Sequence, residues 1–251
     1  MNAAQWKLVL DAPVQEALRW ITEAARQNHP GSQTLLGQWL LDGRGMSPNP
    51  TSAFGWFLKA AQQGYAMAMN MAGRCYENGW GVAPDLQAAI RWYRHAAHKG
   101  LDAGLYNLAN QLASGQGLPR DDTQAFALYQ RAARSGHAKS MTRSGRHLEH
   151  GLGVAQDASK AMACYRGGAE GGDFRGQYAY ARMLAERGET EASLRWLRRV
   201  PLTATPGFLD EVGQLLAESV DARFAALGRE MRDQATRPRA ATPGAVAAGA
   251  P

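Results

Sequence analysis

A pair of glycines separated by one residue recurs along the chain at a constant interval. The pairs are Gly43/Gly45, Gly79/Gly81, Gly115/Gly117 and Gly151/Gly153, each 36 residues after the one before. Single glycines keep the same interval at Gly64, Gly100, Gly136 and Gly172. A period of this length predicts a solenoid, in which each repeat is one supersecondary unit stacked on its neighbours.

The composition is that of one basic, soluble domain. The chain has 251 residues, 45% of them apolar, and the unbroken repeat favours a single elongated domain. The formal net charge is +6. The arginines are scattered rather than gathered in a stripe with stacking aromatics, so we expect no nucleic-acid partner.

Features that bear on the compartment are few. Cys75 and Cys164 occupy non-equivalent positions in different repeats, which favours two free thiols in a reducing compartment. Residues 1–10 lack the long apolar core of a signal peptide, and no segment approaches the roughly 18 apolar residues of a membrane span. We therefore expect a cytoplasmic protein without membrane contact.

Each repeat is expected to hold two helices, here called the A helix and the B helix. The A helices are predicted at about 32–41, 66–77, 102–114, 138–149 and 173–187, and the B helices at about 50–63, 86–99, 123–135, 158–170 and 190–200. The first glycine of each pair follows an A helix, where a left-handed C-cap favours a residue without Cβ. The residues before the B helices are side-chain acceptors suited to N-caps, namely Asn49, Asp85, Asp121 and Asp157.

The packing inside each helix pair follows from residue size. The A helices carry small residues such as Gly73 and Gly145, which face alanines of the B helices and let the two backbones approach closely. The remaining gaps are predicted to be filled by one aromatic residue of each B helix, namely Phe57, Tyr93, Tyr129 and Tyr165. These aromatics and the loop glycines are interpreted as structural.

The repeat pattern also sets the domain boundaries. Residues 13–27 carry the B-helix pattern alone, so residues 1–31 are predicted to form an N-terminal capping half-repeat. The full repeats are 32–65, 66–101, 102–137 and 138–173, followed by a degenerate one at 174–200 that has a shorter loop and no Gly-x-Gly pair.

Residues 66–100 resemble the Sel-one-like repeat (SLR) family, a relative of the tetratricopeptide solenoids. The matching residues are Ala68, Gly73, Tyr76, Gly79-Trp80-Gly81-Val82, Asp85, Ala89, Trp92-Tyr93, Ala96-Ala97 and Gly100. The resemblance covers about residues 14–200. It implies an all-α fold, a right-handed α/α superhelix of about five 36-residue helix-pair repeats, that acts as an adaptor or scaffold for other proteins.

The chain departs from the family pattern at a few positions. Leu128 and Cys164 replace the tryptophan of the third and fourth repeats. One branch of the family closes each repeat with a disulfide and has been linked to β-lactam binding. This chain lacks the paired cysteines, so that activity is not expected here.

After the repeats, residues 203–235 are predicted to form a C-terminal amphipathic helix that begins with Thr205 as a cap, with a break near 219–221 as an alternative. Its apolar residues lie at helical spacing, from Phe208 to Met231. The helix is expected to cover the last repeat; in the rival reading it contacts a partner or dimerises. Residues 236–251 are rich in Pro, Ala and Gly and are predicted to be disordered.

No catalytic motif is present in the sequence. His147/His150 and His95/His98 are spaced three apart on predicted helices, but no third ligand is in register, and they are interpreted as solvated helix-end histidines. The Gly-x-Gly pairs join helix to helix, so they do not fit a phosphate-binding turn. We expect no metal, no cofactor and no enzymatic activity.

Polar residues of the A helices repeat in phase with the core. The resemblance to tetratricopeptide-like solenoids, in which the A helices line the concave face, implies that these residues line that face here. The predicted partner-binding residues are Gln38, Asn70, Arg74, Tyr106, Asn107, Asn110, Arg143, Arg146, Tyr178 and Arg182. Arginine pairs carboxylates in bidentate fashion and asparagine bonds peptide backbone, so such a groove suits an extended or acidic peptide. The alternative interpretation is an ordinary solvated face.

The sequence therefore favours a protein–protein interaction adaptor that binds a peptide or protein segment in its groove. A second hypothesis is an accessory subunit that docks on an enzyme or complex through the C-terminal helix. A third is a small-molecule-binding or hydrolytic repeat protein, which requires a pocket with converging titratable groups. The identity of the partner and the oligomeric state are not predicted.

Overall fold

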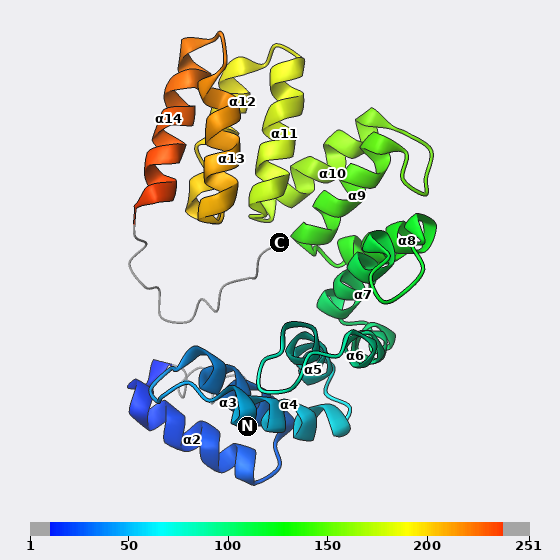
Figure 1. Ribbon diagram of the computed structural model, residues 1–251, viewed down its shortest axis with the longest axis vertical. Coiled ribbons are helices and arrows are strands. Elements are labelled where there is room, and N and C mark those ends of the chain that lie inside the picture. Colours follow the sequence, from blue (N-terminus) through cyan, green and yellow to red (C-terminus); the bar gives the residue numbers. More distant parts are fainter. Residues whose placement is uncertain (1–10, 238–251) are drawn as a thin grey trace. The chain divides into compact units, whose positions relative to one another are not determined.

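The computed structural model describes residues 11–237, and all regular structure in this range is helical (Figure 1). The A helices are α3 (Pro30–Asp42), α5 (Ala66–Asn78), α7 (Asp102–Ser114), α9 (Ala138–His150) and α11 (Phe174–Glu186). The B helices are α2 (Val14–Arg26), α4 (Pro50–Gln62), α6 (Leu86–His98), α8 (Asp122–Arg134), α10 (Ala158–Glu170) and α12 (Thr190–Leu197). A short 3-10 helix (Val200–Leu202), α13 (Pro206–Ala217) and α14 (Ala222–Thr236) complete the described chain.

The predicted helix caps are confirmed. Gly79, with φ of 72°, ends α5 in the left-handed conformation and its N–H donates to the carbonyl of Cys75. Asp85 opens α6, because its carboxylate accepts from the N–H of Ala88 at 2.9 Å. The same pattern recurs in the other full repeats, so short polar and glycine signals fix where each helix begins and ends.

The chain divides into two compact units, and each is described by itself. Of the described residues, 11–108 belong to the first unit and 109–237 to the second. In the first unit, α2 and α3 enclose a cluster around Ile21, Leu36 and Trp39, and the next cluster joins α4 to α5 around Phe57 and Cys75. Consecutive helices of this unit thus share their buried faces, as stacked repeats do.

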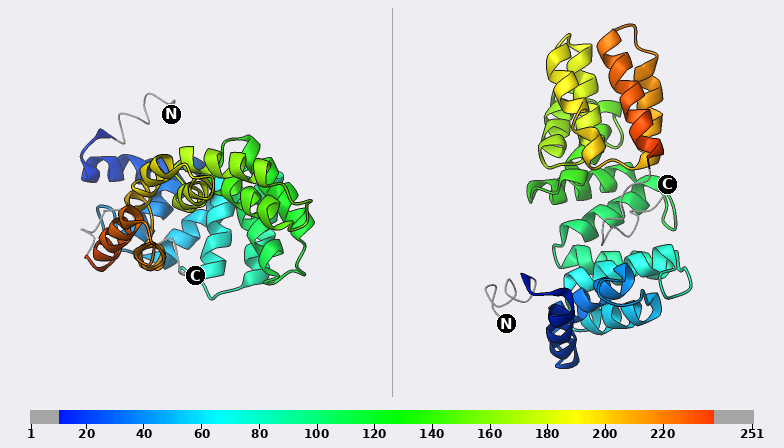
Figure 2. Two further views of the ribbon diagram at one scale, coloured as in Figure 1. Left: turned by 90° about the horizontal axis from the view of Figure 1, so that it is seen from above. Right: turned by 90° about the vertical axis from the view of Figure 1, so that its left-hand side faces the viewer.

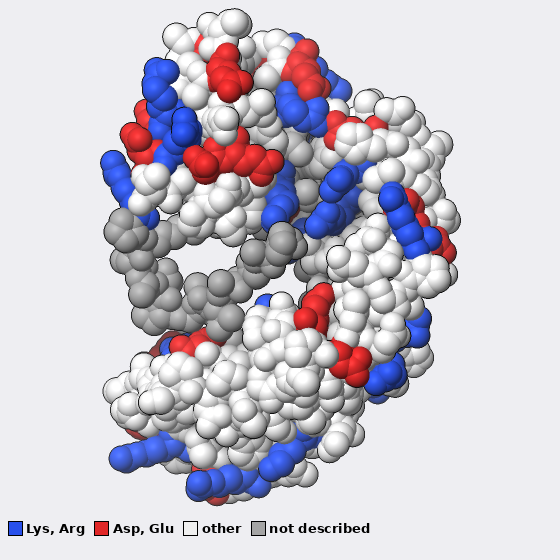
Figure 3. All heavy atoms as spheres, in the orientation of Figure 1, with Lys and Arg blue, Asp and Glu red and all other residues white. Residues whose placement is uncertain are grey.

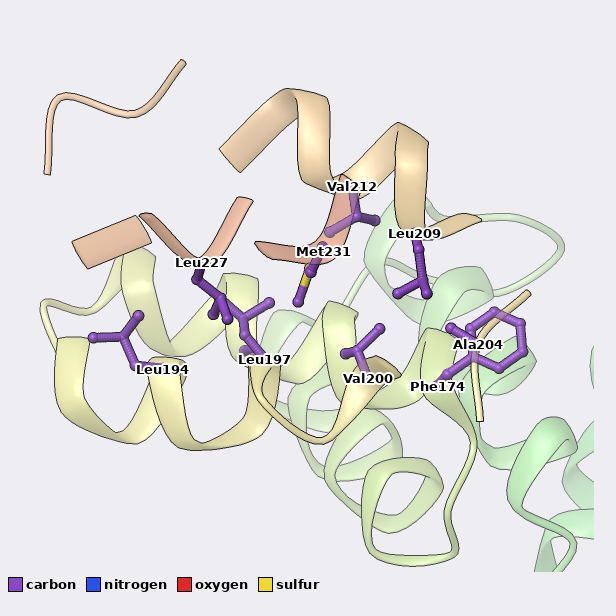
Figure 4. Close-up of a cluster of buried hydrophobic side chains, with 10 residues drawn as sticks. Phe174, Leu194, Leu197, Val200, Ala204, Leu209, Val212, Leu227 and Met231 are labelled. Atoms are coloured by element: carbon purple, nitrogen blue, oxygen red, sulfur yellow. The ribbon is translucent and has the colours of Figure 1, made fainter. Parts of the chain in front are cut away.

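In the second unit, a cluster around Leu148, Tyr165 and Leu184 joins α9, α10 and α11. A further cluster joins α11 and α12 to α13 and α14 (Figure 4). In that figure, apolar side chains from α12 and the 3-10 helix point toward apolar side chains of α13 and α14. The first group is Leu194, Leu197 and Val200, and the second is Leu209, Val212, Leu227 and Met231. Burying these side chains removes apolar surface that α11 and α12 would otherwise expose.

Residues 203–235 form two helices rather than one. The chain turns at residues 218–221, where Asp221 caps α14 by accepting from the N–H of Arg223 at 2.9 Å. The two helices lie side by side in both views of Figure 2. Their contact is close because Gly213 and Gly228 face each other, and a Cβ on Gly213 would lie 2.8 Å from the carbonyl oxygen of Gly228. Two glycines therefore favour a hairpin over a continuous helix.

The second glycine of each Gly-x-Gly pair has a role that differs from that of the first. Gly81 has φ of 72°, and a Cβ there would overlap the carbonyl of Pro50 and lie 2.6 Å from the amide nitrogen of Thr51, in the first turn of α4. Gly153 stands in the same relation to Asp122 and Thr123 in the first turn of α8. The loop of one repeat thus rests on the B helix of the preceding repeat through a residue without a side chain.

The aromatic residues of the B helices pack as predicted and also form hydrogen bonds. The ring of Tyr93 lies over Gly73, where a Cβ would be 2.6 Å from the ring, and its hydroxyl donates to Glu77 at 2.5 Å. Tyr165 donates to Glu149 at 2.6 Å. Each tyrosine therefore ties a B helix to the last turn of its A helix.

Within residues 11–237, none of the helices combines the length and apolarity needed to cross a bilayer. The predicted contribution of residues 1–10 to the N-terminal cap lies outside the described residues. Disorder is predicted from residue 236, but Thr236 is the last residue of α14; the remainder of that prediction, from residue 238 on, also lies outside the described residues.

Candidate partner-binding surface on the A helices

The predicted residues of the first unit lie on α3, α5 and α7, and several of them are bonded to each other or to near neighbours. The side-chain amide of Asn107 donates to the amide oxygen of Asn70 at 2.8 Å, and Asn70 is only 4% exposed. Gln38 donates to Asp42 at 2.9 Å, while Tyr106 is half-buried. Asn70 and Asn107 therefore join two successive A helices, and Asn70 is buried in this contact.

Arg74 is held by an aromatic residue of the following loop. Its guanidinium lies 4.9 Å from the ring centre of Trp80, in a cation–π contact, and Nη1 lies 3.7 Å from the sulfur of Met71. The side chain is half-buried. The contact orients the guanidinium without neutralising its charge, because Trp80 carries no carboxylate.

The second unit contains a network of charged groups that the sequence interpretation missed. Arg182 on α11 forms ion pairs with Glu149 at the end of α9 and with Glu186 one turn further along α11. Glu149 also accepts the hydroxyl of Tyr165. Arg182 is therefore a link between two A helices and is not a free cation.

The pKa directions follow from this arrangement. Burial of Glu149 acts to raise its pKa, but the hydrogen bonds from Tyr165 and Arg182 outweigh it, so the pKa of Glu149 lies below its usual value. Burial lowers the pKa of Arg182, and its two carboxylate partners more than offset this. Glu149 and Arg182 are thus both charged at neutral pH.

The other predicted residues of the second unit differ in exposure. Arg146 on α9 is exposed and Arg143 is half-buried. Asn110 accepts the hydroxyl of Tyr129 at 2.7 Å, and the ring of Tyr178 packs edge-on against Phe208 at 5.8 Å. Burial raises the pKa of Tyr178. Asn110 and Tyr178 therefore support the repeats as well as bordering the surface.

Basic side chains gather over α9 and the adjacent end of α11 (Figure 3). Arg146 and Arg182 both lie close enough to Tyr165 to lower the pKa of its hydroxyl against the larger effect of burial. The second unit thus brings Arg146, Arg182 and Glu149 together around one tyrosine. The arrangement can accept an additional carboxylate through the exposed guanidinium of Arg146.

His147 corrects the sequence interpretation. We expected a solvated helix-end histidine, but its side chain is only 3% exposed. Its Nδ1 lies 2.8 Å from the carbonyl oxygen of Leu152, and its ring stacks on Phe126 at 6.0 Å. Burial lowers the pKa of His147 and favours the neutral ring. His150 is exposed, so the two histidines do not form a pair of ligands.

Among the described residues, no group of three or more His, Cys, Asp or Glu side chains is placed to bind a metal ion. Neither cysteine is disulfide-bonded: Cys75 is buried and Cys164 is half-buried. Burial raises the pKa of the Cys75 thiol to about 12. That thiol is protonated at neutral pH and is shielded from reagents in water.

The stacked helix pairs, with short loops and recurring caps, define a helical repeat protein. Sequence comparison then specifies the class. The Sel1 repeat model matches residues 14–29, 30–65, 66–101, 102–137 and 138–173. The chain therefore belongs to the Sel1 repeat family, whose members generally mediate protein–protein interaction. No curated protein is significantly similar to the chain in sequence.

Solved structures share the fold. A Sel1 repeat protein from Oxalobacter formigenes is 26% identical and superposes with a TM-score of 0.78 over 92% of this chain and 99% of its own. A protective antigen of uropathogenic Escherichia coli that displays an SLR fold is 27% identical, with a TM-score of 0.67 over 89% of this chain; the chain spans 49% of that antigen. An immunity protein of Pseudomonas aeruginosa, 15% identical, superposes with a TM-score of 0.57 over 82% of this chain and 80% of its own, and shares the fold alone.

Proposed function

We propose that the chain is a non-enzymatic adaptor that binds an acidic segment of another protein on the polar columns of its A helices. The observation that carries the proposal is the exposed guanidinium of Arg146 on α9, which lies near Tyr165 together with the Arg182–Glu149 ion pair. Within the first unit, an A helix carries a further guanidinium, that of Arg74, which is oriented by Trp80.

The recognition chemistry follows from the availability of each guanidinium. Arg146 is absent from the ion pairs of the described residues and offers a fork of N–H donors to a carboxylate. Arg182 binds the more exposed Glu186 through one nitrogen, and such an exposed pair within one helix is worth only about 0.3–0.5 kcal/mol. An incoming carboxylate can therefore replace Glu186, while Glu149 keeps the guanidinium in position.

The test is a quantitative pull-down from a lysate of the cells that produce the protein. Arg146→Glu should reduce capture of the specific partner at least tenfold, because one attraction becomes a repulsion. The matched control is Arg94→Glu, an equal charge change at an exposed position of α6. Both variants should first show wild-type helicity and thermal stability. Equal capture by wild type and Arg146→Glu would refute the assignment of the surface.

The C-terminal docking hypothesis makes a different prediction. Most large apolar residues of α13 and α14 are used against α11 and α12, but Leu215 is 59% exposed. Deleting the two helices would uncover the core of the last repeat, so Leu215→Glu is the cleaner change. An accessory subunit that docks there should lose its enzyme on this substitution, whereas a binder that uses the A helices should keep its partner.

The small-molecule or hydrolytic hypothesis is tested by a generic hydrolase screen and a metal analysis of the purified chain. Turnover that is lost on substitution of a named side chain would establish it. Our proposal expects no such turnover.

A further inference from the structure

One position of the B helices carries tryptophan in most repeats but not in all. At intervals of 36 residues it is occupied by Trp20, Trp56, Trp92, Leu128 and Cys164. The next repeat is shortened and places Trp196 on α12. The smallest side chain of the series is therefore the thiol of Cys164, on α10.

The first unit shows what the tryptophan does. Trp56 of α4 packs against the cluster formed by α2 and α3. Trp92 of α6 packs against the alanine-rich cluster that includes Ala60 and Ala61 of α4. In both cases the ring covers apolar surface belonging to the preceding repeat. An aromatic side chain can bury 150–250 Å² in such a position.

At Cys164 the surface of the preceding repeat is left uncovered. A hollow of about 760 Å³ lies between α8 and α10, and Cys164 lines it together with Phe126, Leu148 and Val154. Its lining comes from two B helices, the end of α9 and the loop after it, all within the second unit. The hollow lies on B helices and is therefore separate from the columns of A-helix residues described above.

The charged residues of this hollow are basic. Arg131 and Arg134 of α8 line it, are exposed, and take part in none of the ion pairs formed by the described residues. Lys160 of α10 also lines it and pairs with Asp157 at 2.9 Å. No Asp or Glu belongs to its lining. The hollow therefore combines an apolar interior with a positive rim.

We propose that this hollow is a second docking site, which takes one bulky aromatic side chain of an acidic protein segment. The aromatic ring occupies the position that Trp56 and Trp92 hold in the first two full repeats, and carboxylates beside it in the segment pair with Arg131 and Arg134. Charge complementarity selects the acidic context, because a basic segment would face at least two uncompensated guanidinium groups. The apolar interior favours a bulky aromatic anchor.

Cys164 does not add a charge to this site. Burial raises the pKa of its thiol, and a hydrogen bond with Gln130 opposes that effect only in part. The thiol is protonated at neutral pH, so the electrostatics of the hollow are set by the arginines and the lysine.

The probes are three short peptides of equal length: a tryptophan flanked by glutamates, an alanine flanked by glutamates, and a tryptophan flanked by lysines. Binding to the full chain is measured by isothermal titration at low ionic strength. The acidic tryptophan peptide should bind at least about tenfold more tightly than either of the others. Equal binding of the alanine peptide would show attraction by charge alone and would overturn the proposal.

Two variants, one single and one double, locate the binding. Cys164→Trp introduces the residue that most other repeats carry, fills the hollow, and should abolish binding while keeping or raising thermal stability. Arg131→Glu with Arg134→Glu should weaken binding by about tenfold or more without touching the apolar interior. Cys164→Ala, which keeps the hollow open, is the control for the first change, and Arg195→Glu with Arg198→Glu, on exposed positions of the same unit, is the control for the second.

A direct readout comes from the thiol itself. The acidic tryptophan peptide should slow the reaction of Cys164 with N-ethylmaleimide, whereas Cys75 is fully buried and does not report on the surface. The site is supported as distinct from the A-helix surface if the peptide protects Cys164 from N-ethylmaleimide and if the Arg146→Glu variant binds the peptide as tightly as wild type. Binding without protection, or binding that survives Cys164→Trp in a folded protein, would refute the proposal.

Discussion

The second glycine of each Gly-x-Gly pair is predicted to be required by contact between repeats rather than by the turn alone. Gly153 has φ of 65°, and a Cβ there would overlap the Asp122 carbonyl carbon and lie 2.6 Å from its oxygen. Gly172 has φ of 86°, yet no atom lies within 4 Å of its Cβ position. Alanine at either position adopts a left-handed conformation, but only Gly153→Ala also forces two backbones apart.

The expected magnitudes separate the two effects. The left-handed conformation costs an L-residue about 1–2 kcal/mol, which is the whole cost expected for Gly172→Ala. Gly153→Ala adds an overpacking cost of about 1–3 kcal/mol, because the atoms in the way belong to the first turn of α8 and cannot rotate aside. For a chain of this size, 1 kcal/mol corresponds to about 2–4 °C in Tm.

Thermal unfolding followed by circular dichroism compares the two variants with wild type. Gly153→Ala should melt below Gly172→Ala by several degrees, and urea unfolding should give the same order. An equal loss of stability in the two variants would mean that the turn alone explains the glycine. The contact of the loop with the preceding repeat would then have no energetic weight.

Three further predictions concern single side chains. Tyr93→Phe removes the hydroxyl that donates to Glu77 but keeps the ring, and phenylalanine is already present at the equivalent Phe57. Urea unfolding should show a free energy of unfolding lower by about 0.5–1.5 kcal/mol. An unchanged free energy would contradict the role of the hydroxyl. Folding lowers the pKa of Glu149, so the stabilisation from its carboxylate is present above the unfolded pKa of about 4.3 and is lost as the pH falls. Glu149→Gln should therefore lower Tm at pH 7 and reduce the loss of Tm on acidification. An unchanged dependence of Tm on pH in this variant would contradict the prediction. Folding also lowers the pKa of His147, so below about pH 6.5 the unfolded chain takes up a proton that the folded chain excludes, and stability falls. His147→Met introduces the residue found at the equivalent position 183. This variant should show a smaller decline in Tm between pH 7 and 5 than wild type.

The helices and their boundaries were predictable because their signals are local. A glycine after an A helix and an aspartate before a B helix act within four residues, as Gly79 and Asp85 do. The 36-residue period then places equivalent residues in equivalent surroundings, which is why Tyr93 and Tyr165 were assigned correctly to the core.

The details of the candidate surface were less predictable because they depend on residues far apart in sequence. Arg182 meets Glu149, which is 33 residues away, and Arg74 stacks on a tryptophan of the next loop. His147 shares a helical spacing with His150 but faces the core, where the turn to Leu152 supplies its partner. A sequence pattern places a residue on a helix, but the neighbouring helix determines which charges are already paired.

The absence of an aromatic ring at Cys164 was visible in the sequence as a departure from the repeat. The resulting hollow could not be predicted from the sequence, because it depends on which side chains of α8 lie opposite Cys164. Phe126 and Leu148 leave the space open rather than moving to fill it. The sequence thus shows where a repeat changes, and the structure shows whether the change creates a site.

The central claim, that the A helices form the protein-binding surface, is tested most directly by site-specific photo-crosslinking in living cells. A photoreactive amino acid replaces Arg146 on α9 in one strain and Arg94 on the exposed face of α6 in another. Our account predicts a discrete crosslinked protein from position 146 and none from position 94. A crosslink to the same partner from position 94 alone would contradict it and assign the interaction to the B helices.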